Sequence, residues 1–119
     1  MNWQEIDVIQ KKICAKYKAV HYASPLDMKV GISLNVRSGV TPINGLRHYP
    51  TSDTTGWYLW AGTELSQDSD FFKPLHVRHL DEWCPFILGY LGLPPGWRFL
   101  IFDNYEDVWY DSSLLFDQQ

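Results

Sequence analysis

The sequence predicts an α+β fold: a mostly antiparallel sheet of four to five strands, with two main helices packed on one of its faces. Two apolar stripes of helical period, near the N-terminus and over residues 75–91, predict the helices. Short apolar or alternating runs bounded by Gly, Pro, Asn and Asp predict the strands. Strands and helices do not alternate regularly, which argues against a parallel βαβ sheet. A length of 119 residues suits a single domain spanning residues 1–119.

The first helix follows from apolar residues spaced three or four apart at the start of the chain: Trp3, Ile6, Ile9, Ile13, Tyr17 and Val20. The lysines between them fall largely on the other side of the helix, where we expect them to be solvated. The residue before a proline avoids helical angles, so the helix should fade near Ser24–Pro25.

The next two strands are predicted over 30–36, where apolar residues alternate with Gly31, Ser33 and Asn35, and over 56–62, which is apolar on both faces. Residues 37–55 are rich in Gly, Pro, Ser and Thr. They predict a long loop with room for one short strand.

The second helix is predicted over 75–91, and Pro85 should kink or split it because proline supplies no amide donor. Two aromatic-rich runs follow, over 97–102 and 106–111. Asp103–Asn104 tolerates turn angles, so these runs should form an antiparallel hairpin. We expect the core to be anchored by an aromatic pair, with Trp57 or Trp60 on one strand and Trp97 or Phe99 on another.

Charge is distributed unevenly along the chain. Residues 1–50 carry seven Lys and Arg against three acids, whereas residues 51–119 carry three against eleven, which together give the net charge of −4. The acidic second half disfavours nucleic acid and anionic membranes as partners, since both carry phosphate. It suits a basic protein partner. The alternative is that the excess acid only keeps the protein soluble.

No pattern of catalytic or metal-binding residues stands out. His76 and His79 are spaced to share one face of a helix, but no further ligand is placed to join them. Nucleophile-elbow and phosphate-loop motifs are absent. Cys14 and Cys84 lie among apolar residues, which predicts buried reduced thiols. We therefore expect no enzyme activity, no metal and no cofactor.

Carboxylates and tyrosines concentrate in the predicted hairpin, and two further acids lie in the "SQDSD" turn. On a strand, Glu106 and Asp107 point to opposite faces, so they cannot act as a catalytic pair. Charge can steer a basic partner and rings can anchor it. The predicted partner-binding residues are Asp68, Asp70, Asp103, Tyr105, Glu106, Asp107, Tyr110 and Asp111. The competing interpretation is structural, with Asp107 capping backbone amides near the "PPGW" loop beside Trp109.

The chain has a family resemblance over about Gly56–Leu115. Two segments carry it: "GWYLWAGTELSQDSDFFKPLHVRHL" and "LGLPPGWRFLIFDNYEDVWYDSSLL". They resemble a family of bacterial immunity proteins that was once a domain of unknown function. Such proteins are small, cytoplasmic and encoded beside secreted polymorphic toxins. The resemblance implies binding and neutralisation of a cognate toxin, without catalysis.

The predicted function is therefore that of a cytoplasmic immunity protein, whose partner is a cognate and basic toxin. The sequence shows neither a signal-peptide pattern nor an apolar run of transmembrane length, which agrees with the expected cytoplasmic location. The alternative function is a non-catalytic binding or adaptor module, and a small enzyme is the less favoured third choice.

Overall fold

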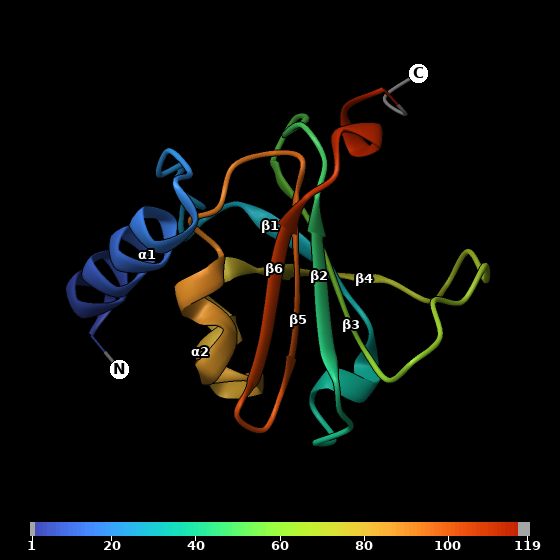
Figure 1. The fold of residues 1–119 in the computed structure, drawn as a ribbon. Coiled ribbons are helices and arrows are strands. Elements are labelled where there is room, and N and C mark those ends of the chain that lie inside the picture. The colour runs from blue at the N-terminus through green and yellow to red at the C-terminus, as the bar shows by residue number, and fades with distance from the viewer. Residues whose placement is uncertain (1, 117–119) are drawn as a thin grey trace.

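The computed structural model describes residues 2–116, which form one six-stranded sheet with few helices (Figure 1). The helices are α1 (Trp3–Tyr17) and α2 (Leu80–Trp83), with the 3₁₀ turns η1 (Leu34–Val36), η2 (Val77–His79), η3 (Pro85–Tyr90) and η4 (Ser112–Leu115). The strands are β1 (Lys29–Ile32), β2 (Ile43–Arg47), β3 (Thr54–Ala61), β4 (Lys73–His76), β5 (Trp97–Phe102) and β6 (Tyr105–Tyr110).

The sheet has the order β4-β1-β3-β2-β5-β6, and all neighbours are antiparallel except β1 and β3. The predicted mostly antiparallel sheet is confirmed, but the predicted number of four to five strands is too low. The strand that fits inside the predicted 37–55 loop is β2, and it lies centrally between β3 and β5. The additional strand is β4, which occupies the start of the predicted second helix.

Helix α1 begins where the Asn2 side chain accepts a hydrogen bond from the Gln4 amide at 2.8 Å. It ends earlier than predicted, because Lys18 takes a left-handed conformation with φ of 61° and closes the last turn. Val20, predicted on the apolar stripe, is exposed. The buried face of the helix is spaced by four residues: Ile6, Gln10 and Cys14.

The second predicted helix is instead a series of short elements. Leu75 and His76 pair with β1 and so belong to the edge strand β4. Helix α2 has four residues and ends before Pro85, which supplies no amide donor. The 3₁₀ turn η3 then continues toward Gly92. Its apolar side chains still reach the core, where Leu80, Ile87, Leu88 and Leu91 are buried.

The predicted strand over 30–36 also ends early, at Ile32, and residues 34–36 form the turn η1. Leu34 is consequently exposed, whereas Val36 is buried.

The main core lies between one sheet face and the helices. Trp57 and Phe99 are both 1% exposed, with ring centroids 5.5 Å apart, so the predicted aromatic anchor is confirmed for this pair. Tyr90 stacks on Phe99 from the helix side. Gly45 is required beneath the same ring, because a β-carbon there would come within 2.2 Å of Phe99. Trp97 is only half-buried.

Arg47 is fully buried at the end of β2 and joins the sheet to two loops. Its guanidinium donates hydrogen bonds to the backbone carbonyls of Tyr22, Ala23, Thr55, Leu91 and Leu93. Burial lowers the pKa of Arg47 to about 10, which leaves it protonated at neutral pH.

The two faces of the sheet are covered differently (Figure 1). Helices α1 and α2 lie on one side, and the 62–72 loop and the C-terminal turn η4 lie on the other. On that second side, Leu46, Trp60 and Leu114 form a small cluster, against which Phe71 and Phe72 pack.

Candidate protein-binding surface

The β5–β6 hairpin turns at Asp103–Asn104, as predicted, and pairs Phe102 with Tyr105. Asp103 has a φ of 51°, in the left-handed region that Asp and Asn tolerate in tight turns. This register decides which side chains share a face. Glu106 points toward the helices, while Tyr105 and Asp107 point to the opposite face of the sheet.

The carboxylate of Glu106 is occupied by contacts within the fold. Tyr17 and Tyr90 donate their hydroxyl hydrogen bonds to it, and Lys16 Nζ lies 2.9 Å from its Oε2. Burial would raise the pKa of Glu106, but the hydrogen bonds from Tyr17, Tyr90 and Lys16 together outweigh it and leave the pKa lowered. Glu106 therefore joins α1, η3 and β6.

Asp111 is also bound internally. Its side chain accepts hydrogen bonds from the Ser113 amide at 3.1 Å and the Ser113 hydroxyl at 2.6 Å, and it pairs with Arg98 at 3.1 Å. The hydrogen bonds from Ser113 and Arg98 lower the pKa of Asp111. Asp111 also donates its backbone amide hydrogen to the Gly96 carbonyl at 2.7 Å, which joins the end of β6 to the loop before β5.

Asp103, Tyr105 and Asp107 are exposed on the hairpin. Within residues 2–116, the side chains of these three residues make no hydrogen bond or ion pair. Tyr110 is exposed too, but it lies on the helix side of the sheet, where its ring packs beside Trp97 with centroids 5.7 Å apart.

Asp68 and Asp70 lie on the 62–72 loop between β3 and β4, not on the hairpin. Asp68 accepts a hydrogen bond from the Asp70 amide at 2.9 Å, and both acids line a hollow of about 350 Å³ together with residues 33–35. Strand β2 separates this region from β5 and β6. The eight residues predicted from the sequence therefore do not form one continuous patch: Asp68 and Asp70 lie on the 62–72 loop, and the hairpin residues are divided between the two faces of the sheet.

Sequence reasoning missed Leu100, Phe102 and Trp109, which lie on the same face as Tyr105 and Asp107. The signal was available. A two-residue turn at Asp103–Asn104 pairs Phe102 with Tyr105, and alternation then places Leu100 and Trp109 on that face. The β5 run, WRFLIF, is apolar on both faces, which hid the difference between core and surface.

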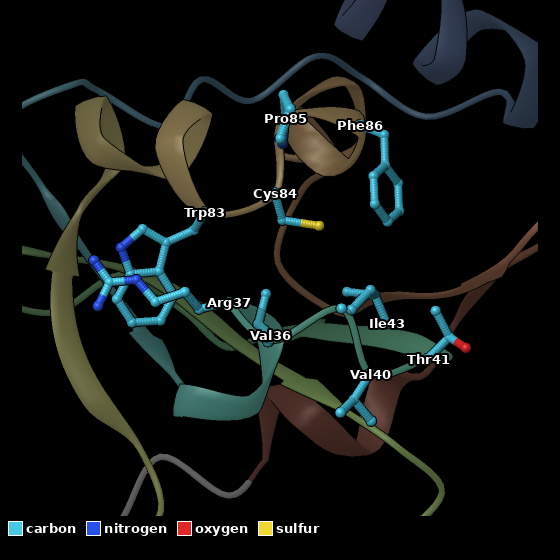
Figure 2. Close-up of a pocket in the computed structure, with 10 residues that line it drawn as sticks. Val36, Arg37, Val40, Thr41, Ile43, Trp83, Cys84, Pro85 and Phe86 are labelled. Atoms are coloured by element: carbon cyan, nitrogen blue, oxygen red, sulfur yellow. The ribbon is translucent and has the colours of Figure 1, made fainter.

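A separate apolar hollow of about 160 Å³ lies between the 36–43 segment and the α2–η3 junction (Figure 2). Cys84 and Phe86 stand across from Val40 and Ile43, and Arg37 stacks on Trp83, with 4.6 Å between its guanidinium carbon and the ring centroid. Burial raises the pKa of the Cys84 thiol to about 11, so the thiol is protonated at neutral pH and a poor nucleophile.

Cys14 and Cys84 are buried free thiols, as predicted. His76 and His79 occupy β4 and η2 rather than one helix, with ring centroids 6.3 Å apart. In the stretch from residue 2 to residue 116, no three His, Cys, Asp or Glu side chains gather as a metal site would require. None of the helices over the same stretch has the length and the apolar character of a membrane span.

A family model described as the Imm33-like domain matches residues 9–111. The match covers the resemblance noted over Gly56–Leu115 as far as residue 111, and it extends toward the N-terminus over β2, β1 and the part of α1 from residue 9 onward. No curated protein and no solved structure matches the chain.

Proposed function

The chain belongs to the Imm33-like family, and from that membership we propose that it is an immunity protein, which binds a toxin protein and neutralises it. The observation that carries the proposal is the match of the family model over residues 9–111. We further propose that the toxin belongs to a polymorphic toxin system and that the encounter takes place in the cytoplasm of the producing cell.

Binding alone is sufficient for such a function, so the protein needs no catalytic residue. The hollow around Cys84 has mainly apolar walls and a thiol whose pKa is raised. Glu106 and Asp111, the two carboxylates with lowered pKa values in the hairpin region, are held by partners within the fold. These features favour a binding protein over an enzyme.

A basic toxin is the partner that the charge distribution favours. Exposed carboxylates occur on the hairpin, at Asp103 and Asp107, and on the 62–72 loop, at Asp68 and Asp70. None of these four forms an ion pair with another residue between 2 and 116. Unpaired surface carboxylates can steer a basic protein toward its site and accelerate association.

The test uses the C-terminal domain of a secreted toxin encoded beside this gene. We expect a bacterial host that expresses the domain to lose viability, and co-expression of this chain to restore it. A toxin domain inactivated by mutation should co-purify with the chain. An unrelated immunity protein, which should not protect, serves as the control. Failure of protection together with failure to form a complex would reject the immunity function. Binding without protection would favour the adaptor alternative.

A further inference from the structure

The sheet face over β5 and β6 on the side away from the helices carries apolar and acidic side chains together. We define the open face as Leu100, Phe102, Tyr105, Asp107 and Trp109. We propose that the open face is where a basic surface of the toxin docks, an inference that rests on the proposed immunity function and assigns its interface.

The register of the hairpin brings these side chains onto one surface. Leu100 pairs with Asp107 and Phe102 pairs with Tyr105, and Trp109 lies opposite Arg98. The alternate residues Phe99 and Ile101 are buried on the helix side. Because side chains alternate along a strand, the open face is held on two paired strands rather than on a mobile loop.

Among residues 2–116, the side chains that cover the rest of this sheet side do not extend over the open face. Phe71, Phe72 and Leu114 pack on Leu46 and Trp60 over β2 and β3.

None of the apolar members of the open face belongs to either hydrophobic cluster of residues 2–116. Phe102 is 45% exposed and Tyr105 is 56% exposed, while Leu100 and Trp109 are half-buried. Adjacent exposed apolar side chains of this kind are typical of interaction sites.

Charge decides what kind of partner fits. Arg98, the residue paired with Trp109 beside the open face, already forms an ion pair with Asp111 and stacks on Trp109, with its guanidinium carbon 5.4 Å from the ring centroid. Asp107 and the nearby Asp103 have no ion-pair partner among residues 2–116, so the surface is left with net negative charge.

The lysines of α1 lie across the sheet from the open face, on the helix side (Figure 1). The carboxylate and aromatic rings of the open face therefore point away from the lysines of α1. Arginine and lysine side chains can pair with Asp107 while their stems and charges pack on Tyr105 and Trp109. A basic protein surface is the complementary partner.

The experiment measures binding of the inactivated toxin domain from the neighbouring gene to full-length variants of this chain. Asp107→Lys reverses one charge on the open face, and Tyr105→Ala removes one ring. Glu82→Lys is the matched control, since Glu82 is an exposed acid in α2 on the helix side. A thermal melt establishes that each variant is folded.

We expect Asp107→Lys to slow association roughly tenfold at low salt, with the loss shrinking as salt is added. Tyr105→Ala should raise the dissociation rate several-fold, and Glu82→Lys should bind like the wild type.

Wild-type binding with unchanged kinetics in both open-face variants would overturn this interface and leave the immunity function standing. A toxin domain that the wild type neither binds nor neutralises would overturn both.

Discussion

Tyr17, the last residue of α1, donates its hydroxyl hydrogen bond to Glu106, in the first half of β6 and 89 residues away in the chain. Tyr90 of η3 donates to the other carboxylate oxygen. One carboxylate thus connects the N-terminal helix, the turn after α2 and the edge strand of the sheet.

Replacing Glu106 by Ala should destabilise the fold. The substitution leaves the hydroxyls of Tyr17 and Tyr90 without their acceptor, and hydrogen bonds to a charged group contribute about 1.5–3 kcal/mol. We expect the free energy of unfolding, measured with urea, to fall by about 2 kcal/mol. Asp107→Ala is the matched control on the neighbouring residue, which faces solvent, and should change stability little. Equal losses in both variants would contradict the role assigned to Glu106.

Acid should weaken the same connection. Folding lowers the pKa of Glu106 from its ordinary value of 4.5, so the unfolded chain takes up a proton at a higher pH than the folded one. The stabilising contribution is therefore present above about pH 4.5 and is lost as the pH falls through the folded pKa. Urea denaturation between pH 6 and pH 3 should show the difference between wild type and Glu106→Gln shrinking toward low pH. A difference that stays constant over this range would exclude the carboxylate charge as its cause.

Arg47→Met should be among the most damaging substitutions. Methionine cannot donate to the five carbonyls that the guanidinium satisfies, and buried carbonyls without donors cost free energy. We expect a loss of roughly 3–5 kcal/mol in the free energy of unfolding. Lys12→Met, which removes an exposed cation from α1, is the control and should have a small effect. A stable Arg47→Met variant would show that the loops at 22–23 and 91–93 are held by other contacts.

The two thiols should be unreactive in the folded protein. Cys14 and Cys84 are 2% and 4% exposed, and burial raises the pKa of both. We expect a thiol reagent to label both cysteines rapidly in denaturant. Under native conditions, labelling should be slow and limited by the unfolding of the protein. Rapid labelling of a single thiol that is lost in Cys84→Ser would instead indicate that the hollow around Cys84 opens in solution.

Features that depend on neighbouring residues could be predicted from the sequence. The Asp103–Asn104 turn, the pairing of 97–102 with 106–110 and the start of α1 follow from local turn chemistry and periodicity. The apolar runs narrowed the aromatic anchor to Trp57 or Trp60 with Trp97 or Phe99, and the structure shows that the pair is Trp57 and Phe99. These signals do not depend on distant parts of the chain, so the features that they predict are found in the structure.

Other features could not be predicted, because they depend on partners that are far apart in the chain. Short segments such as β2 and β4 become strands through the neighbours that pair with them, which propensity does not encode. Glu106 and Asp107 look alike in the sequence. Glu106 is structural because Tyr17 and Tyr90 donate to it on the helix side of the sheet. Asp107 points to the opposite face, where it is exposed and its side chain contacts no hydrogen-bond partner among residues 2–116.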